Sequence, residues 1–220
     1  HEAGGMSENG AHGSTRLPSA PMNKPPRPSR GEAAGSVRII GGRWRGTRLQ
    51  VPHKPGLRPT SDRVRETLFN WLMPVLPGAK VLDLFAGSGA LGLEAVSRGA
   101  ASARLVEADP QLAQALESTA ARLGASAEVQ VRQGDALAWL GAGDGERYDI
   151  AFVDPPFGAN LWPAVLELLP ARMAADAWLY LESPADHTPL LPAEWALHRE
   201  SGTREVRYAL YRRVTLAQVP

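Results

Sequence analysis

The sequence predicts an α/β protein built on a mostly parallel β-sheet with helices on both of its faces. From Lys80 onward, strand-like runs alternate with helix-like runs, which is the pattern of a parallel sheet joined by crossover helices. A glycine-rich turn follows the first buried strand of this series. Only the short stretch "SGT" separates the last two predicted strands, so they must form a hairpin. We therefore expect a seven-stranded, mostly parallel sheet whose last strand is antiparallel to its neighbour.

The elements can be assigned by residue range. Strands are predicted at Val81–Leu84, Ala103–Glu107, Glu128–Arg132, Tyr148–Val153, Ala177–Glu182, Trp195–Glu200 and Glu205–Tyr211. Helices are predicted at about Leu91–Arg98, Pro110–Leu123, Ala136–Leu140 and Leu161–Met173. Upstream, two β-prone runs, Val37–Ile40 and Thr47–Val51, suggest a small N-terminal β-hairpin, and a capping signal at Thr60 or Ser61 opens a helix that ends at Pro74.

Composition excludes several classes of protein. The chain has 220 residues and no cysteine, which rules out a disulfide framework, cysteine-ligated zinc and a thiol nucleophile. No apolar run approaches the length of a bilayer span, and no signal-peptide core is visible. We expect a cytoplasmic protein, a monomer with no membrane partner and no metal ion.

Charge is distributed unevenly along the chain. Residues 1–65 carry 12 Lys and Arg against 4 Asp and Glu, whereas residues 66–220 carry 12 against 19. A basic N-terminal segment on an acidic body is typical of a protein whose one end meets a polyanion, although a basic linker can also simply be solvated. Residues 1–36 are rich in Pro, Gly and Ser and lack bulky apolar side chains, so they are predicted to be a disordered basic tail.

The stretch "VLDLFAGSGALGLEA" combines a buried strand, a glycine-rich turn and the start of a helix. Gly87, Gly89 and Gly92 match the G-x-G-x-x-G pattern of dinucleotide-binding folds, and Glu107 ends the next strand roughly 20 residues later. Asp83 precedes these glycines, where its charge would repel a pyrophosphate and attract an ammonium or sulfonium group. The pattern therefore favours S-adenosylmethionine over a nicotinamide dinucleotide. The alternative is that backbone N–H groups of the turn simply satisfy Asp83.

Two further acids follow later strands. Glu107 in "VEADP" can accept hydrogen bonds from both ribose hydroxyls of such a ligand. It could instead cap a helix, although Asp109 before Pro110 suits that position better. Asp135 in "QGDALAW" could accept from an adenine amino group or cap the helix that follows it, and both roles can hold together.

The stretch "DPPF", formed by Asp154, Pro155, Pro156 and Phe157, ends a strongly apolar strand. The prolines stiffen the loop and keep the residue before each of them extended. The Asp154 carboxylate and the Pro155 carbonyl can accept the two hydrogens of an exocyclic amine, which frees its lone pair to attack a sulfonium methyl group. Phe157 offers a face for a base removed from its helix. Without cysteine, carbon-5 methylation of pyrimidines is excluded, which leaves nitrogen or oxygen as the acceptor.

Four stretches together, "FAGSGALGLEA", "VDPPF", "RIIGGRWRGTRL" and "GLRPTSDRVRETLFNWL", resemble the bacterial 16S rRNA guanine-N2 methyltransferases of the RsmD family. The resemblance runs from about Val37 to Tyr211. The "DPPF" signature is shared with adenine-N6 and cytosine-N4 methyltransferases, whereas the two upstream blocks are specific to the family. The resemblance implies a Rossmann-like class I S-adenosylmethionine-dependent methyltransferase that methylates N2 of guanine 966 in 16S rRNA, within an assembling 30S particle.

Matching motifs carry the family's site onto this chain. The amine site would be Asp154 to Phe157. The cofactor would be held by Thr60, Arg63, Asp83, Phe85, Ala86, Gly87, Ser88, Gly89, Glu107, Asp135 and Ala136. Arg63 could meet the cofactor's carboxylate, but it could equally form a surface ion pair.

A basic segment around the predicted hairpin suggests RNA binding. Its residues are Arg38, Arg43, Trp44, Arg45, Arg48, Lys54 and Arg58. Arginines bind phosphates and tryptophan stacks on unpaired bases, although Trp44 could instead pack on the body of the domain. We thus expect three parts: the tail at 1–36, an RNA-binding extension at 37–58, and a methyltransferase domain at 59–215.

Three other functions compete with this interpretation. An adenine-N6 or cytosine-N4 amino-methyltransferase on DNA or RNA would share "DPPF", but on DNA it would need a sequence-reading domain for which the chain has little room. A non-catalytic RNA-binding assembly factor would be favoured by a degraded amine site, yet "DPPF" is intact. A nicotinamide-dependent dehydrogenase is disfavoured by Asp83 and leaves "DPPF" unexplained.

Overall fold

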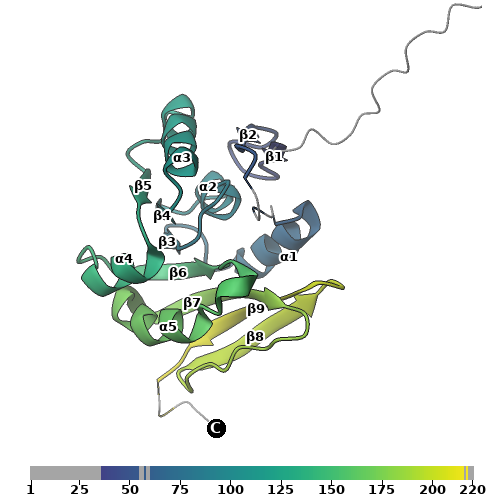
Figure 1. Ribbon diagram of the computed structural model, residues 1–220, viewed down its shortest axis with the longest axis vertical. Coiled ribbons are helices and arrows are strands. Elements are labelled where there is room, and N and C mark those ends of the chain that lie inside the picture. The colour runs from purple at the N-terminus through teal and green to yellow at the C-terminus, as the bar shows by residue number, and fades with distance from the viewer. Residues whose placement is uncertain (1–35, 55–56, 58–59, 216, 218–220) are drawn as a thin grey trace, which may run out of the picture. The chain divides into compact units, whose positions relative to one another are not determined.

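A seven-stranded β-sheet forms the centre of the protein in the computed structural model, which describes residues 36–54, 57, 60–215 and 217 (Figure 1). Its strands lie in the order β5-β4-β3-β6-β7-β9-β8, and β1 and β2 form a separate two-stranded sheet. Residues 33–220 group as one unit that includes this small sheet. The predicted tail, apart from Ser36, and Arg58 lie outside the described residues.

The strands and helices have the following bounds. The strands are β1 (Ser36–Arg38), β2 (Arg48–Gln50), β3 (Lys80–Asp83), β4 (Ser102–Glu107), β5 (Val129–Gln133), β6 (Tyr148–Val153), β7 (Met173–Pro184), β8 (Trp195–Gly202) and β9 (Val206–Arg213). The helices are α1 (Asp62–Leu72), α2 (Ala90–Ser97), α3 (Pro110–Arg122), α4 (Ala136–Ala142) and α5 (Trp162–Leu168), with short 3-10 turns at Phe157–Ala159 and Leu169–Arg172.

The sheet is parallel from β5 to β7 and antiparallel at its other end. β9 pairs antiparallel with both β7 and β8, so the hairpin between the last two strands is confirmed. The last strand lies between β7 and β8, and the strand before it forms the edge. This order, which the local sequence did not indicate, is possible because the irregular connection from 185 to 194 carries the chain past the position that β9 later fills.

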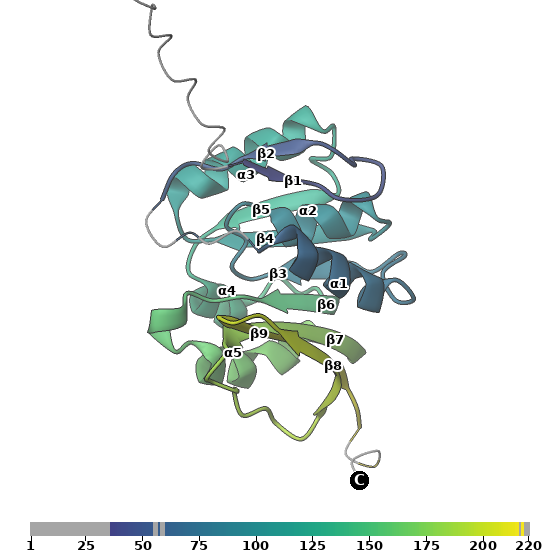
Figure 2. The same cartoon turned by 90° about the vertical axis from the view of Figure 1, so that its right-hand side faces the viewer.

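Helices cover both faces of the sheet, as the alternating pattern predicted. Side chains of α1, α2 and α3 pack in one hydrophobic cluster with β3, β4 and β5, and those of α4 and α5 pack in a second cluster on the opposite face. Figure 2 shows α1 and α2 in front of the sheet. Every residue of α2 is buried. This helix is therefore enclosed between the sheet and the N-terminal hairpin.

Several element boundaries differ from the sequence-based assignment. The predicted helix at 161–173 is wrong at its C-terminal end, because α5 stops at Leu168 and a 3-10 turn leads into β7 at Met173. Pro170 has no N–H to continue the helical hydrogen bonds, which explains the break. β7 is accordingly longer than predicted, whereas β1 and β2 of the N-terminal hairpin are shorter than predicted.

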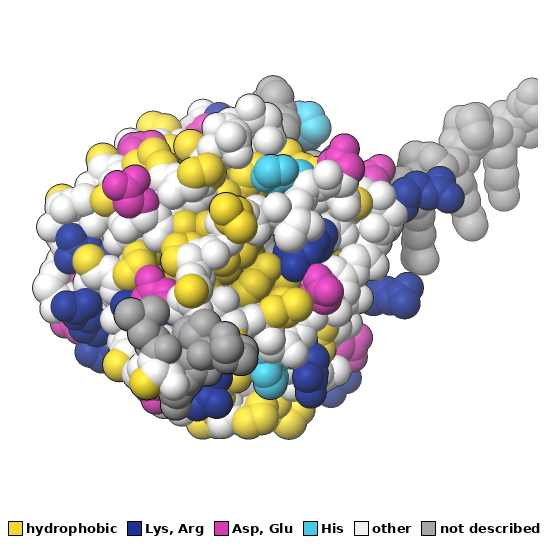
Figure 3. Space-filling view, turned by 90° about the horizontal axis from the view of Figure 1, so that it is seen from below, with side chains coloured by type: hydrophobic (Ala, Val, Ile, Leu, Met, Phe, Trp, Pro, Cys, Tyr) yellow, Lys and Arg dark blue, Asp and Glu magenta, His cyan; other side chains and the backbone are white. Residues whose placement is uncertain are grey.

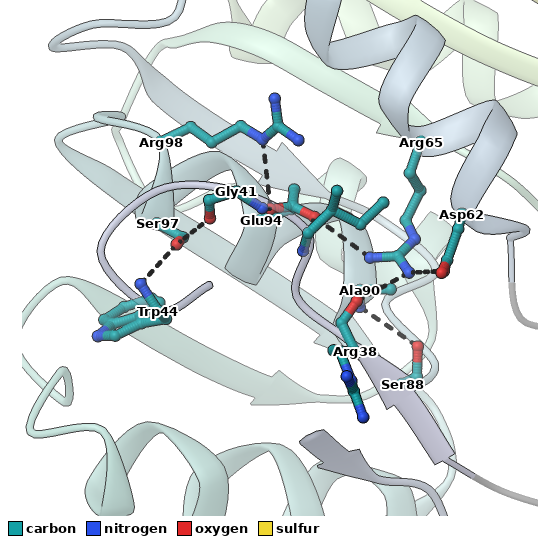
Figure 4. Close-up of polar contacts among 11 residues, drawn as sticks. Arg38, Gly41, Trp44, Asp62, Arg65, Ser88, Ala90, Glu94, Ser97 and Arg98 are labelled. Atoms are coloured by element: carbon teal, nitrogen blue, oxygen red, sulfur yellow. Dashed lines mark hydrogen bonds and ion pairs between the residues drawn. The ribbon is translucent and has the colours of Figure 1, made fainter. Parts of the chain in front are cut away.

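The N-terminal hairpin is fastened to the domain through the buried carboxylate of Glu94 on α2 (Figure 4). The backbone N–H groups of Ile40 and Gly41 donate to its two oxygens at 2.8 and 3.0 Å. Arg65 of α1 and Arg98 lie on the same carboxylate, each with a nitrogen 3.3 Å from an oxygen. Glu94 and Arg65 are both 0% exposed, so this cluster joins the hairpin, α1 and α2 away from solvent.

Hydrophobic side chains gather near the centre of the face shown in Figure 3, with charged side chains around them. In the part of the chain that follows β7, the large apolar side chains most open to solvent are Leu190, which is 94% exposed, and Leu197 on β8, which is 50% exposed.

Among the described residues, no helix has both the length and the apolar character needed to cross a bilayer. The same residues contain no group of three or more His, Cys, Asp or Glu arranged to hold a metal ion.

Candidate active site

A cavity of about 800 Å³ opens at the carboxyl ends of β3, β4 and β6. β3 lies between β4 and β6, and the order of the strands reverses there. In open α/β sheets, ligands bind in the crevice at such a switch point. The position of the cavity is therefore what this topology leads us to expect for a binding site.

The cavity brings together most of the residues that the sequence predicted for it. The lining includes the predicted residues Thr60, Asp83, Phe85, Ala86, Gly87, Ser88, Glu107, Asp135, Ala136, Asp154, Pro155, Pro156 and Phe157. Arg63 and Gly89 are not among the lining residues. Arg63 is exposed on α1, and Gly89 is buried at the N-cap of α2, so a cofactor contact by either residue stays a prediction.

Asp83 ends β3 and is only 2% exposed. Its Oδ2 accepts a hydrogen bond from the Gly92 N–H at 3.1 Å, which is the backbone contact considered as the alternative role. Burial nevertheless raises the pKa of Asp83 to about 7, and the charges of Asp154 and Glu107 add to this shift. Glycine at position 92 allows α2 to approach β4 closely, because a Cβ there would stand 2.2 Å from the side chain of Leu105. The third glycine of the motif thus serves packing.

Glu107 and Asp135 both accept hydrogen bonds from backbone N–H groups of neighbouring turns or helix starts. The two oxygens of Glu107 accept from Gly87 at 2.9 Å and from Asp109 at 2.8 Å, so this carboxylate orders the glycine turn. Asp135 caps α4 through the N–H of Ala138 at 2.9 Å. Each carboxylate oxygen has two lone pairs. Both side chains therefore keep acceptor capacity toward the cavity that they line.

The "DPPF" segment follows β6 directly. Asp154 is half-buried, Pro155 is buried, and Phe157 begins the 3-10 turn Phe157–Ala159. The Phe157 ring lies 6.4 Å from that of the buried Trp162, centroid to centroid, which fixes it at the rim of the cavity. The segment therefore presents a carboxylate, a carbonyl and an aromatic side chain at one end of the cavity.

Glu182 on β7 is a residue of this site that the sequence interpretation missed. It lines the cavity and is 5% exposed, and the Thr60 hydroxyl donates to its Oε2 at 3.3 Å. Burial raises the pKa of Glu182, and the charge of Asp83 adds to this shift, whereas the hydrogen bond from Thr60 lowers it. An acid inside the apolar run "WLYLESP" was the available signal. Thr203 and Glu205, in the β8–β9 turn, also line the cavity and were missed.

Of the residues predicted to bind RNA, those that the structure describes lie outside the cavity lining, on or near the N-terminal hairpin. Trp44 packs against the hydrophobic core while remaining partly exposed, so its packing role is present. The Arg43 guanidinium lies 4.4 Å from the centre of the Trp44 ring and pairs with Glu128. Lys54 pairs with Asp109 at 3.4 Å. The exposed members are Arg38, Arg43, Arg45 and Arg48.

Comparison with known sequences identifies close relatives. The family model described as "Conserved hypothetical protein 95" matches residues 37–212. The ribosomal RNA small subunit methyltransferase D of Escherichia coli K12 is 50% identical over 183 residues, which cover 82% of this chain and 91% of that protein. The protein of the same name from Haemophilus influenzae is 42% identical and covers 81% of this chain and 95% of its own length.

Solved structures agree with these sequence matches. The putative methyltransferase yhhF from Escherichia coli superimposes with a TM-score of 0.75 at 47% identity, covering 81% of this chain and 98% of that one. The putative methylase HI0767 from Haemophilus influenzae gives 0.72 at 37% identity, covering 82% and 100%. An RNA methyltransferase from Salinibacter ruber, solved in complex with S-adenosyl-L-homocysteine, shares the fold at 16% identity, with a TM-score of 0.53 and coverage of 74% and 99%. The chain therefore belongs to the Conserved hypothetical protein 95 family, that of the small-subunit ribosomal RNA methyltransferases D (RsmD).

Proposed function

We propose that the protein transfers a methyl group from S-adenosylmethionine to the exocyclic N2 amine of a guanine in 16S rRNA, guanine 966 by family resemblance. The relatives named as ribosomal RNA methyltransferases support the reaction class. The observation that carries the proposal is that Asp154 of "DPPF" lines the same cavity as Asp83 and Glu107. An acceptor for an amine and acids suited to a cationic nucleoside thus share one space.

The lining of the cavity fits the cofactor's chemistry. S-adenosylmethionine supplies a methyl group on a positively charged sulfur. Asp83 offers a negative charge at the end of β3, which attracts a cation most strongly where water is excluded. Glu107 and Asp135 offer carboxylate oxygens for hydroxyl and amino donors. Salinibacter ruber's RNA methyltransferase, which has the same fold, was solved with the demethylated product of this cofactor.

The "DPPF" segment performs the positioning in this proposal. The Asp154 carboxylate and the Pro155 carbonyl accept the two hydrogens of the N2 amine, so its lone pair leaves conjugation with the ring. The carboxylate also favours the positive charge that develops on nitrogen as the new bond forms. Phe157, held by Trp162 at the rim, stacks on the base after it leaves its helix.

The exposed arginines of the hairpin supply the RNA-binding surface in this proposal. Arg38, Arg45 and Arg48 reach solvent, and Arg43 covers one side of the Trp44 ring. Guanidinium groups beside an aromatic ring suit phosphates and unpaired bases of structured RNA. The substrate would be 16S rRNA within an assembling 30S particle in the cytoplasm.

The experiment is methyl transfer from labelled S-adenosylmethionine to 30S particles that lack the native modification, followed by identification of the labelled nucleoside. We expect label in N2-methylguanosine with the wild type. Asp154→Ala should reduce transfer by about 10²–10³-fold while cofactor binding, measured by calorimetry, persists. The matched control is Asp176→Ala, at an exposed position of β7 outside the cavity, which should leave transfer unchanged.

Label in another nucleoside would overturn the guanine-N2 assignment. Absence of transfer despite tight cofactor and RNA binding would instead favour the non-catalytic assembly factor. The same assay tests the RNA surface with a variant in which Arg45 and Arg48 are both changed to alanine. We expect a higher KM, a weaker dependence on salt and the same labelled nucleoside.

A further inference from the structure

Glu182 and Asp154 meet because β6 and β7 are neighbours in the sheet. These two parallel strands pair Val153 with Leu181, so the next residue of each strand lies at the mouth of the cavity beside its counterpart. Both acids line the cavity, and Asp154 influences the ionisation of Glu182. Two carboxyl groups from segments nearly thirty residues apart therefore face the place where the "DPPF" segment would hold a base.

The surroundings of Glu182 leave its carboxyl group available to a ligand. Within the described part of the chain, no Lys, Arg or His forms an ion pair with it. Its polar neighbours are the Thr60 hydroxyl, the Tyr180 hydroxyl and the carboxyl groups of Asp154 and Asp83. The backbone is held firmly, since the Trp162 indole N–H donates to the Glu182 carbonyl at 2.9 Å. The backbone of Glu182 is thus held in place, while its carboxyl group receives few hydrogen bonds from the protein.

Guanine differs from the other amine-bearing bases in the group next to its amine. Its ring N1 carries a hydrogen, so N1–H and the N2 amine form two adjacent donors. Adenine and cytosine have an unprotonated ring nitrogen, an acceptor, next to their amines. A carboxylate beside the amine-binding carboxylate would therefore attract guanine and repel the lone pair of adenine or cytosine.

We propose that Glu182 is a specificity-determining residue that accepts the N1–H of the target guanine, while Asp154 accepts from the N2 amine. This inference rests on the proposed function, because it assumes that a base enters the cavity amine first. It adds a reason why this "DPPF" site would select guanine, whereas the same signature in other enzymes serves adenine and cytosine. The selectivity then comes from β7, outside the motif itself.

The test replaces the target guanine with 2-aminopurine, which keeps the N2 amine but has an unprotonated N1. The modified 16S rRNA is assembled by ligation and reconstituted into 30S particles, and kcat/KM for methyl transfer is measured for both bases. A hydrogen bond to a charged group should favour guanine by about 10–100-fold in the wild type. Glu182→Gln can donate its amide to the unprotonated N1, so the preference should shrink to about threefold or less.

The matched control is Glu205→Gln, the same change at a carboxylate that lines the cavity from the β8–β9 turn. Whatever its effect on rate, it should leave the ratio between the two bases at the wild-type value. Equal transfer to guanine and 2-aminopurine by the wild type would overturn the inference without any variant. An unchanged ratio in an active Glu182→Gln enzyme would do the same. If the wild type labels no guanine at all, the proposed function fails first, and the labelled nucleoside shows it.

Discussion

Glu94 and Glu182 are both buried glutamates, but their partners differ completely. Glu94 receives two backbone N–H groups and two arginine side chains, Arg65 and Arg98. Glu182 faces a hydroxyl donor and another acid, Asp154, and its pKa is raised by burial. Asp83 resembles Glu182 in that burial raises its pKa, here to about 7, although backbone N–H groups, including that of Gly92 at 3.1 Å, donate to it.

This difference distinguishes a buried acid that stabilises the fold, Glu94, from buried acids that are suited to bind a ligand, Asp83 and Glu182. A buried carboxylate is costly unless cations and N–H groups surround it. At Glu94 this compensation comes from three parts of the chain, so the carboxylate ties the hairpin, α1 and α2 together. At Asp83 and Glu182 compensation within the protein is incomplete. A cationic or hydrogen-bond-donating ligand would complete it, which is why perturbed acids mark functional sites.

The largest effect should follow from removing the charge of Glu94. Among the described residues, Glu94→Gln leaves the buried Arg65 with only the exposed Asp62 as anionic partner, so we expect the free energy of unfolding to fall by about 3–5 kcal/mol. Denaturant unfolding measures this. The control Glu146→Gln removes half of an exposed pair with Lys80 and should change stability little. Similar losses in the two variants would remove the distinction between the two kinds of acid.

Removing the charge of Asp83 should have the opposite effect on stability and raise the free energy of unfolding. Its folded pKa of about 7 lies above the ordinary 3.8, so burial of the ionised form costs stability as pH rises from 3.8 to 7, and the full cost remains above pH 7. Asp83→Asn, which keeps an acceptor for the Gly92 N–H, should stabilise the cofactor-free protein by roughly 2–4 kcal/mol at pH 8 and by less at pH 5. The same variant should bind S-adenosylmethionine at least about tenfold more weakly. A destabilised variant at pH 8 would contradict the comparison.

The smallest effect concerns the pH dependence of guanine methylation. The groups facing Glu182 are Asp83, Asp154, Tyr180 and the Thr60 hydroxyl, so no described cation counters its raised pKa. Protonated Glu182 is a weaker acceptor for the N1–H of guanine than the carboxylate, and kcat/KM should therefore rise with pH, by up to about tenfold per unit, until this acid is ionised. Glu182→Gln should flatten this rise. An identical profile in both proteins would assign the dependence to another group.

Local patterns singled out the "DPPF" segment and most of the predicted cofactor residues that line the cavity, but they did not reveal Glu182, Thr203 or Glu205. Asp83 and Glu107 end their strands and Asp135 follows one, each just before a turn or helix, so a single stretch of sequence reveals them. Gly89 shows the limit of such patterns. Its contact with the cofactor stays a prediction; the structure shows that it is buried, has a φ of 80°, and that a Cβ there would stand 2.5 Å from the Leu116 side chain. Glycine is needed at position 89 because Leu116 of α3, a helix later in the chain, packs against it.

The sequence by itself determined the alternating α/β architecture, the hairpin of the last two strands, the glycine turn and the "DPPF" segment, because each depends on residues close together in the chain. Tertiary structure alone decided that β9 lies between β7 and β8, and that Glu94 fastens the hairpin to α2. It also decided that Glu182 meets Asp154. These features depend on strand neighbours and on burial. Both arise only when distant segments pack, and no local spacing encodes them.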